Sequence, residues 1–357
     1  MNENDFDSIL GQIKYSAPYS DRGSHDNHNH TSSLDFEKNN MVLIRFGLLV
    51  FIAVVYVEHC IGTWETLHDR PIIAILAQSV EGTPLEGLGK SYILASYVKY
   101  IESSGGRVVP ILNNLTENEI NKLFQSVNGV LFPGGDVSVT SSDFARTGRI
   151  IYKLAIEAFD NDDYFPLWGT CLGFELLSVL RSGTAEVLSQ CDSENLAIPL
   201  NFTEGYRKSR LFENISTNIA KFLSSSPTTL NLHNEGVYTT TFKKREKLMN
   251  FFHVLSTNVD RKGKEFVSTM EGITYPFYGT QWHPEKNSFE WTLNQNIPHE
   301  EMSIKVTQYM SNFFVNEGRY SKHRFRTMEE EQSALIYNFL PMCTAKISNW
   351  EQSYIFQ

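Results

Sequence analysis

Apolar and polar residues follow a regular pattern from Arg70 onward. Short, continuously apolar runs that are typical of buried strands occur at residues 71–76, 107–112, 129–132 and 164–168. Amphipathic stretches lie between these runs. In residues 91–103, one helical face carries Ile93, Leu94, Tyr97, Val98 and Ile101. This alternation predicts an α/β fold in which a doubly wound, mostly parallel sheet is covered by helices on both faces of a single domain.

Two local signals mark the ends of the expected helices. Gly105-Gly106 follows the stretch that begins at Ser91, and glycine commonly ends a helix in this way. Thr116 and Glu119 have the spacing of a capping box, which predicts that the next helix begins there. In sheets of this kind, active sites form in the loops that leave the carboxyl ends of the strands. The residues that follow the expected strands are therefore the candidates for chemistry.

The first forty residues lack this pattern. Residues 1–40 are polar and have no sustained apolar period, so we expect a disordered tail. The tail contains His25, His28 and His30. A short histidine-rich tract in a solvated tail ordinarily binds nothing specific, and no metal site is predicted.

The character of the chain changes at Met41. Arg45 precedes the apolar run 46–57, which is too short to span a bilayer comfortably. Cys60 and Gly62 are small residues at the −3 and −1 positions of a cleavage site. Residues 41–62 therefore predict a secretory signal, with translation beginning at Met41. An uncleaved membrane anchor behind the polar tail is the alternative.

Acceptor sequons agree with entry to the secretory route. Asn114, Asn201 and Asn214 each begin an Asn-X-Ser/Thr sequence and are candidates for glycosylation. A single sequon is often accidental. Together with the signal, the three favour a secreted protein or one that resides in the lumen of a lysosome or vacuole.

Composition narrows the class of protein. The chain has 357 residues, of which 41% are hydrophobic, so it can bury a sizeable core. Its formal net charge of -10 repels phosphate backbones, and no long run of Lys or Arg offsets that charge. We therefore expect no nucleic-acid partner.

The cysteines are few and scattered. Cys60, Cys171, Cys191 and Cys343 do not form the dense framework of a disulfide-rich domain or the close pairs of a zinc site. At least one thiol is therefore free to react. Whether Cys191 and Cys343 pair with each other stays open.

The sequence around Cys171 predicts a nucleophile elbow. Trp168-Gly169-Thr170-Cys171-Leu172-Gly173 follows an apolar strand and precedes an apolar helical stretch at residues 174–180. Glycines two residues on either side of the cysteine allow a sharp strand-to-helix turn, as in G-x-S-x-G hydrolases. We expect the turn to expose the sulfur and the helix N-terminus to lower the pKa of the thiol.

A second motif supplies a base. Gln281-Trp282-His283-Pro284-Glu285 lies at the end of the apolar run 275–282. A histidine that leaves a strand end can face the elbow, take the proton of Cys171 and later give it to a leaving amine. Glu285 can then orient the imidazole and stabilise its charged form.

A glycine pair follows the third expected strand. In Pro133-Gly134-Gly135, the backbone N–H of Gly135 can point toward a developing oxyanion, together with the N–H of Leu172. Pro-Gly-Gly is also an ordinary turn sequence, so this assignment depends on the elbow.

These motifs occur in the order typical of the class I glutamine amidotransferase superfamily. More narrowly, the chain resembles the γ-glutamyl hydrolases that shorten folate poly-γ-glutamates. The narrower resemblance covers nearly all of the chain from Arg70 and rests on the segments Ala95–Tyr100, Asp163–Trp168, Pro199–Thr203, Ser268–Gly272 and Ala334–Tyr337.

The resemblance implies a flavodoxin-like catalytic domain at residues 63–317, followed by a packed C-terminal extension at 318–357. It implies hydrolysis of a γ-glutamyl amide through a thioester at Cys171, with His283 as acid and base. His233 and Glu175 are implied as substrate-binding residues, although Asn234-Glu-Gly after His233 departs from the vertebrate pattern. A homodimer and no metal or organic cofactor are implied as well.

Two other functions fit the same residues. One is a glutaminase domain that supplies ammonia to a synthase partner, since the side-chain amide of glutamine is also a γ-amide. The other is a membrane-anchored, non-catalytic binding protein on a hydrolase fold. The predicted signal disfavours the first, and the intact set of Cys171, His283 and Glu285 disfavours the second. Whether a hydrolase would cut terminal or internal bonds stays open.

Overall fold

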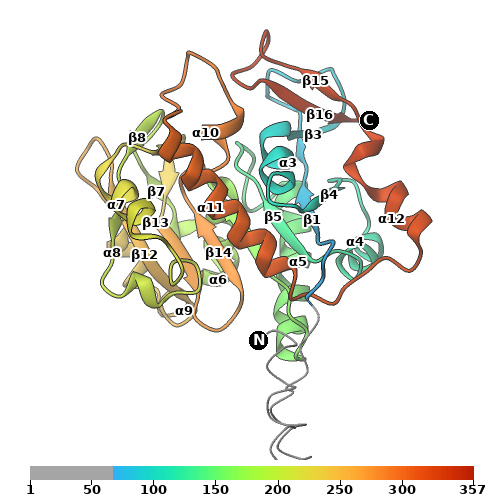
Figure 1. The fold of residues 1–357 in the computed structure, drawn as a ribbon, viewed down its shortest axis with the longest axis horizontal. Coiled ribbons are helices and arrows are strands. Elements are labelled where there is room, and N and C mark those ends of the chain that lie inside the picture. The colour runs from blue at the N-terminus through green and yellow to red at the C-terminus, as the bar shows by residue number, and fades with distance from the viewer. Residues whose placement is uncertain (1–66) are drawn as a thin grey trace, which may run out of the picture. The chain divides into compact units, whose positions relative to one another are not determined.

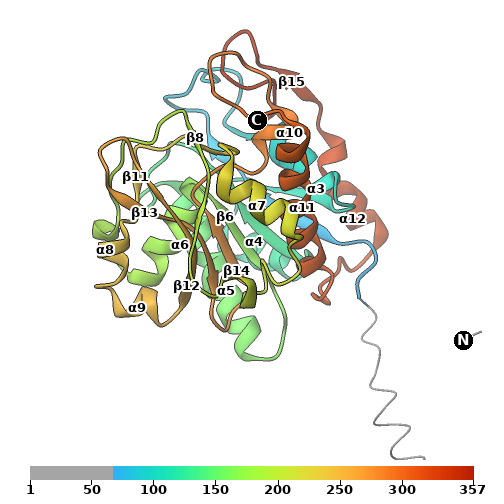
Figure 2. The same cartoon turned by 60° about the vertical axis from the view of Figure 1, so that its left-hand side comes forward.

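An eight-stranded sheet forms the centre of residues 67–357, the part of the chain that the computed structural model describes (Figures 1 and 2). The strand order is β4-β1-β5-β6-β14-β13-β12-β9, in which the first five strands are parallel and the last three run antiparallel to their neighbours. The strands in that order are β4 (Arg107–Ile111), β1 (Ile72–Leu76), β5 (Gly129–Phe132), β6 (Leu167–Thr170), β14 (Phe277–Thr280), β13 (Glu265–Gly272), β12 (Phe252–Val259) and β9 (Asn201–Phe202). The predicted mostly parallel α/β sheet is confirmed.

Helices cover both faces of this sheet. Side chains alternate along β1, so Ile72, Ala74 and Leu76 pack in one core layer, and Ile73 and Ile75 pack in the other. Helices α4 (Glu117–Phe124), α5 (Asp143–Asp160) and α6 (Leu172–Ser182) contribute to the first layer. Helices α3 (Ala95–Glu102), α7 (Thr217–Ser225) and α11 (Glu301–Gly318) contribute to the second. The shorter helices are α8 (Thr239–Phe242), α9 (Glu246–Met249), α10 (Lys286–Phe289) and α12 (Met328–Ala334).

A smaller antiparallel sheet joins the C-terminal segment to the start of the domain. Its order is β15-β16-β3-β2, and its strands are β15 (Pro341–Cys343), β16 (Gln352–Phe356), β3 (Ser91–Leu94) and β2 (Gln78–Ser79). β16 pairs with β3, which leads directly into α3. Residues Thr66–Gln357, including this segment, form one compact unit.

Two short antiparallel pairs complete the strands. They are β8 (Leu196–Ile198) with β10 (Thr229–Asn231), and β7 (Ser189–Gln190) with β11 (Glu235–Gly236). The three-residue 3-10 helices lie at Ala185–Val187, Tyr206–Lys208 and Ile336–Asn338.

Several predicted elements are found at their expected positions. β1, β4 and β5 match the first three apolar runs within one residue, and the apolar stretch after the elbow forms α6. The capping box of α4 is present. The Thr116 N–H donates to Oε2 of Glu119 at 2.8 Å, and the Glu119 N–H donates to Oγ1 of Thr116 at 3.4 Å.

Three expected boundaries were wrong. The stretch 91–103 is helical only from Ala95, because Ser91–Leu94 pairs as β3 with two other strands and this pairing overrides the helical period. The fourth strand begins at Leu167 rather than at residue 164, and β14 begins at Phe277 rather than at residue 275. Both strands begin directly after a proline, which has no N–H to donate to a ladder.

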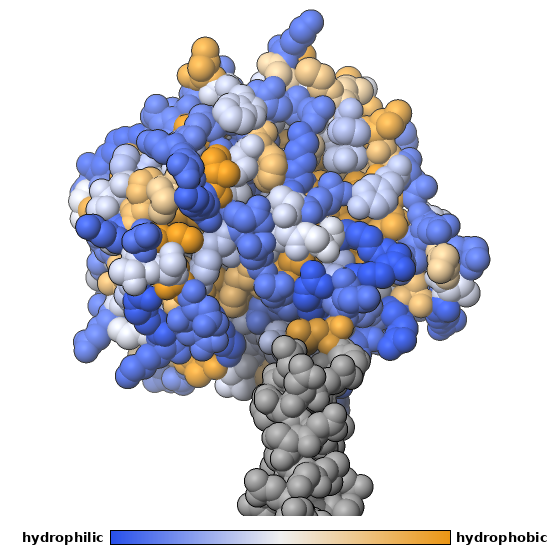
Figure 3. All heavy atoms as spheres, viewed as in Figure 1, coloured by the Kyte–Doolittle hydropathy of each residue, from blue (hydrophilic) through white to orange (hydrophobic). Residues whose placement is uncertain are grey.

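The predicted tail at residues 1–40 and the signal or anchor segment at 41–62 lie outside the described residues. Within the described part of the chain, no helix has both the length and the apolar character needed to cross a membrane. Figure 3 shows that the face seen in Figure 1 is mostly hydrophilic, with apolar residues scattered across it.

Candidate active site

Three neighbouring parallel strands bring the predicted motifs to one edge of the sheet. Phe132 of β5 is paired with Gly169 of β6, and Thr170 of β6 is paired with Thr280 of β14. The Pro-Gly-Gly loop, Cys171 and the segment leading to His283 therefore leave adjacent strands at their carboxyl ends, where sites form in sheets of this kind.

The turn at Cys171 has the geometry of an elbow. Cys171 adopts φ 52° and ψ −108° directly before α6, in a region of the map that side chains other than glycine rarely occupy. A methyl group on Gly173 would lie 2.0 Å from the carbonyl oxygen of Phe132, and one on Gly169 would lie 2.5 Å from the backbone of Gly173. Only glycine permits this close packing of the helix against the strands.

His283 and Glu285 form a close pair beside the thiol. Nδ1 of His283 is 2.8 Å from Oε1 of Glu285, so the proton of the neutral ring is assigned to Nδ1, which donates to the carboxylate. Nε2 of His283 is buried and has no hydrogen-bond partner in the described residues. A methyl group built on Gly134 would lie 2.6 Å from Cε1 of His283 and 3.1 Å from Cβ of Cys171. The side chains of His283 and Cys171 therefore lie close to each other beside Gly134.

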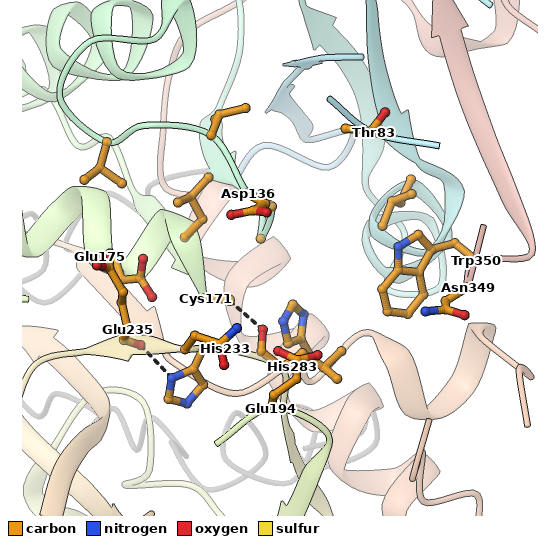
Figure 4. A pocket seen from close by; sticks show the side chains of 18 of the residues that line it. Thr83, Asp136, Cys171, Glu175, Glu194, His233, Glu235, His283, Asn349 and Trp350 are labelled. Atoms are coloured by element: carbon orange, nitrogen blue, oxygen red, sulfur yellow. Dashed lines mark hydrogen bonds between the residues drawn. The ribbon is translucent and has the colours of Figure 1, made fainter. Parts of the chain in front are cut away.

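In the resting arrangement, the thiol does not yet donate to the imidazole. Sγ of Cys171 donates instead to the carbonyl oxygen of Leu232 at 3.7 Å, and Figure 4 shows both side chains, Cys171 and His283, in the same pocket. The thiol proton must turn from Leu232 toward Nε2 before it can be transferred. Catalytic hydrogen bonds are often long before a substrate is bound.

The expected low pKa of the thiol is wrong. Cys171 is only 4% exposed, and this burial, followed by the nearby carboxyl of Glu175, raises the pKa of the thiol well above its usual value. The N–H of Leu172 at the start of α6 hydrogen-bonds the sulfur and lowers the pKa, but this effect is outweighed. The nucleophile therefore depends on proton transfer to His283.

The pKa of Glu285 is shifted down, whereas that of Cys171 is shifted up. Burial opposes its ionisation, but the charge and hydrogen bond of His283, followed by the charge of Lys286, outweigh burial and hold the pKa of Glu285 below its usual value. Glu285 is completely buried and remains an anion that can orient and stabilise an imidazolium.

The loop that carries Gly135 is fixed by two side chains. Nε2 of Gln78 donates to the carbonyl oxygen of Gly134 at 2.7 Å, and the N–H of Gly134 donates to the hydroxyl of Tyr97 at 2.7 Å. A methyl group on Gly135 would lie 1.6 Å from Oε1 of Gln78, so this position requires glycine. Because the N–H of Gly134 is already used, Gly135 is the donor that the glycine pair can offer to an oxyanion. The other candidate donor, the N–H of Leu172, hydrogen-bonds the sulfur in this structure and would have to exchange that partner for the oxyanion.

His233 lies in the wall of the pocket, with an oxygen near each nitrogen of its ring. Nδ1 is 2.6 Å from the carbonyl oxygen of Glu235, and Nε2 is 3.1 Å from Oδ1 of Asn231. Burial lowers its pKa to about 4, so the ring is neutral at physiological pH and has a single N–H. Both oxygens are acceptors, so only one contact is a hydrogen bond, and the shorter one assigns the N–H to Nδ1, which donates to Glu235. This arrangement suits a fixed wall residue better than a proton carrier.

Glu175 is also buried in the wall. Oε1 accepts a hydrogen bond from Nε2 of Gln281 at 2.9 Å, and burial raises the pKa of Glu175 to about 8. The side chain is therefore mostly protonated at neutral pH, and its charge raises the pKa of Cys171 in the ionised form that grows as the pH rises through about 8.

These groups line a cavity of about 840 Å³. Its lining includes the carboxyl groups of Asp136, Glu175, Glu194 and Glu235, and its only Lys or Arg is Lys286. The C-terminal segment contributes part of the wall with Ser348, Asn349 and Trp350. Within residues 67–357, no cluster of His, Cys, Asp and Glu is arranged to hold a metal ion.

The other two thiols of the described residues take no part in a disulfide. Cys191 and Cys343 are both free, so the pairing that the sequence left open is not formed in this structure. Cys191 is buried, whereas Cys343 lies exposed on β15.

Sequence analysis assigned no role to four residues that shape the site. Tyr97 was expected only as part of an apolar helix face, although its hydroxyl lies 3.4 Å from Nδ1 of His283. Gln78 is a polar residue just after a buried strand, which was a usable signal. Lys286 follows the histidine motif directly, and Trp350 had no local signal because it reaches the site only through the pairing of β16 with β3.

Comparisons with known proteins find close similarity over most of the chain. The model of the family described as Peptidase C26 matches residues 71–285. The γ-glutamyl hydrolase of Homo sapiens is 48% identical over 287 residues, which is 80% of this chain and 90% of that protein. γ-Glutamyl hydrolase B of Dictyostelium discoideum is 40% identical over 312 residues, which is 87% of this chain and 89% of that protein. Among solved structures, the glutaminase domain of Trypanosoma brucei CTPS with bound acivicin has a TM-score of 0.46 at 14% identity, over 72% of this chain and 97% of that one.

Proposed function

Because this chain belongs to the peptidase C26 family, we propose that it hydrolyses γ-glutamyl amide bonds, with Cys171 as the nucleophile and His283 as its proton-transfer partner. γ-Glutamyl hydrolysis is the activity named for relatives that are 40 to 48% identical to this chain. The observation that carries the residue assignment is the 2.8 Å pair of Nδ1 of His283 with Glu285, which leaves Nε2 without a partner beside the thiol.

The first half of the reaction forms a thioester. Nε2 of His283 takes the proton of Cys171, and the sulfur attacks the carbon of the γ-carbonyl group. The carbonyl oxygen becomes an oxyanion that accepts hydrogen bonds from the N–H groups of Leu172 and Gly135. The intermediate then collapses, the C–N bond breaks, and the leaving nitrogen takes the proton from Nε2 and departs as an amine.

The second half regenerates the enzyme. A water molecule loses a proton to Nε2 of His283 and attacks the thioester carbon. The C–S bond breaks, the sulfur takes the proton back from His283, and the γ-carboxylic acid is released. Glu285 holds Nδ1–H throughout and remains ionised, so it orients the ring and stabilises the imidazolium in both halves.

The substrate that we propose is a small molecule that carries a poly-γ-glutamate chain, of the folate class. The cavity of about 840 Å³ is within the usual range for small-molecule sites and is large enough for several glutamyl units or a glutamyl unit with an aromatic carrier. A homodimer remains a prediction, which light scattering would test. The choice between terminal and internal bonds stays open, and the identity of the first products would decide it.

A substrate comparison tests the proposed function. We expect the purified chain to shorten pteroyl-penta-γ-glutamate and to release no ammonia from glutamine. Cys171→Ala should lower turnover by roughly 10⁴-fold or more while the fold is retained, because it removes the nucleophile and little packing. Cys343→Ala is the matched control and should behave as wild type, since that thiol is exposed and does not line the cavity. Products are followed by chromatography and the fold by circular dichroism.

The outcomes separate the alternatives. Ammonia from glutamine without folate cleavage would make the chain a glutaminase, and activity with neither substrate would favour a binding protein. Folate cleavage by Cys171→Ala at the wild-type rate would refute the nucleophile assignment.

The second prediction concerns the different roles of His283 and Glu285. His283→Ala should lower kcat about as severely as Cys171→Ala, because it removes the ring whose Nε2 has no other partner and is placed to take the proton of the thiol. Glu285→Ala leaves both reacting groups in place and removes only the carboxylate that orients the ring, so kcat should fall by less than in either of those variants. Steady-state kinetics measure both. A loss for Glu285→Ala as large as that for Cys171→Ala would show that Glu285 does more than orient the ring.

The third prediction follows from the pKa of Glu175, which burial raises to about 8. Below this pH the carboxyl is neutral, and above it a negative charge appears in the wall of the pocket. The substrate carries α-carboxylates, so repulsion on the order of 1 kcal/mol should raise KM roughly fivefold between pH 7 and pH 9. Glu175→Gln keeps the acceptor for Gln281 and should have a KM that is nearly independent of pH. The same rise of KM in both proteins would contradict this role.

We also propose that the chain acts in the secretory route, in the lumen of a lysosome or vacuole or outside the cell. The support is the sequence of residues 41–62 together with Asn114, Asn201 and Asn214, whose side chains are all exposed in the folded domain. Exposure is required of a residue that carries a glycan in a folded protein.

The fourth prediction tests this route. Expressed as the full chain in a eukaryotic host, the protein should lose mass on treatment with an endoglycosidase. Replacing the three asparagines one at a time by glutamine should remove the mass difference in steps. The control is the same chain made in a bacterial cytosol, which should not shift. An unshifted mass from the eukaryotic host, with the protein retained in the cytosol, would refute the proposed route.

A further inference from the structure

A buried ammonium group lies directly behind the catalytic pair, and the reaction as described does not use it. The side chain of Lys286 is 1% exposed, and its Nζ donates to Oγ of Ser96 at 3.2 Å. Nζ lies 3.6 Å from Oε1 of Glu285 and 3.7 Å from Oε1 of Glu290. Burial of a charged group costs free energy unless an opposite charge lies close to it. The two carboxylates compensate the charge of Lys286 in this way.

An aromatic ring of the C-terminal segment covers the same ammonium. Nζ of Lys286 lies 3.9 Å from the centre of the ring of Trp350 and 5.2 Å from the centre of the ring of Tyr97. Both distances are within the range of a cation–π interaction, which is strongest for a desolvated cation on tryptophan. Trp350 therefore contributes to the position of Lys286 from the C-terminal segment.

Hydrogen bonds of the two neighbouring residues hold Trp350 in this place. The N–H of Glu351 donates to Oε2 of Glu290 at 2.8 Å, so one carboxylate binds both the C-terminal segment and the ammonium of Lys286. Nδ2 of Asn294 also donates to Oδ1 of Asn349 at 3.2 Å. Residues 349–351 are thus bound on both sides to the segment that follows the His283 motif.

The geometry does not suit Lys286 as a direct anchor for substrate carboxylates. It is the only Lys or Arg of the cavity lining, but its side chain is nearly inaccessible and its charge already faces two carboxylates. Its effect must therefore pass through a neighbour. The neighbour that takes part in the reaction is Glu285, whose Oε1 is also the acceptor for Nδ1 of His283.

We propose that Lys286 is a positioning residue for the Glu285–His283 pair, and that the C-terminal segment acts on the reaction by holding Lys286 through Trp350 and Glu290. This inference rests on the proposed function. The positive charge keeps the buried carboxylate of Glu285 ionised and in place, and so keeps Nδ1–H of His283 turned toward it. The titratable groups that face Glu285 are His283, Lys286, Cys171, Tyr97 and Tyr100, and Glu290 at the C-terminal end of α10 faces Lys286.

The test is the pH profile of kcat/KM. Lys286→Met keeps the length of the side chain and removes its charge. Loss of a positive charge raises the pKa of each nearby acid, so the acid limb of the profile should move to higher pH by about one unit. Lys286→Arg restores a positive charge and should move the limb back toward wild type. Lys305→Met is the matched control, because Lys305 is an exposed lysine of α11 paired only with Glu301 across one helical turn, and its profile should not move.

A second pair of variants tests the C-terminal segment with Lys286 intact. Trp350→Leu removes the ring that covers Nζ, so the acid limb should move in the same direction by a smaller amount. Trp350→Phe keeps an aromatic face and should remain close to wild type. Circular dichroism and thermal unfolding identify any variant that is not folded.

An independent readout separates this inference from the proposed substrate. The rate at which iodoacetamide alkylates Cys171, followed by mass mapping of its peptide, should show the same displaced acid limb in Lys286→Met and Trp350→Leu. If wild type cleaved no γ-glutamyl bond, the proposed function would fail while the alkylation profile still tested Lys286. The positioning role of Lys286 would be overturned if the folded Lys286→Met variant lost activity equally at every pH and its acid limb stayed unmoved in both the kcat/KM and the alkylation profiles. A wild-type profile for Trp350→Leu would overturn the role of the C-terminal segment.

Discussion

The parallel register of β5, β6 and β14 is the constraint on which the candidate site depends. Because Phe132 is paired with Gly169 and Thr170 with Thr280, the glycine loop, the thiol and the imidazole leave the sheet at one edge. Side chains alternate between the faces of a sheet, so a slip of one residue would send a whole strand's side chains to the wrong layer. Since all residues of these three strands are buried, the core layers resist that slip and thereby fix the site.

Charge balance explains how a buried thiol can act as a nucleophile. Oε1 of Glu285 lies 2.8 Å from Nδ1 of His283, and Nζ of Lys286 lies near the carboxyl groups of both Glu285 and Glu290. The anionic Glu285 stabilises the imidazolium that forms when His283 takes the proton of Cys171. Burial and the charge of the same carboxylate raise the pKa of the thiol, so in the proposed reaction the thiolate forms together with the imidazolium and not before it.

Local sequence signals predicted the parts of the structure that depend on residues close together in the chain. The strands β1, β4 and β5, the capping box at Thr116 and the strand-to-helix turn at Cys171 all depend on residues within a few positions. The failures come from partners far along the chain. Ser91–Leu94 has a helical pattern but pairs with β16, and the thiol pKa depends on burial and on Glu175 rather than on the helix N-terminus alone. Hydrophobic periodicity carries no information on either effect.

Two parts of the chain that are far apart in sequence build the cavity around the proposed reacting groups. Cys171, His283 and Glu285 lie within the matched family region, which ends at residue 285, and most of the cavity wall lies there too. The wall is completed from outside that region by Ser348–Trp350, which the pairing of β16 with β3 brings to the site. In the proposed reaction the same groups would act on any γ-amide that reaches the thiol, so discrimination among γ-glutamyl substrates has to come from the wall. The determinants of substrate choice are therefore to be sought both in the family region and in the C-terminal segment.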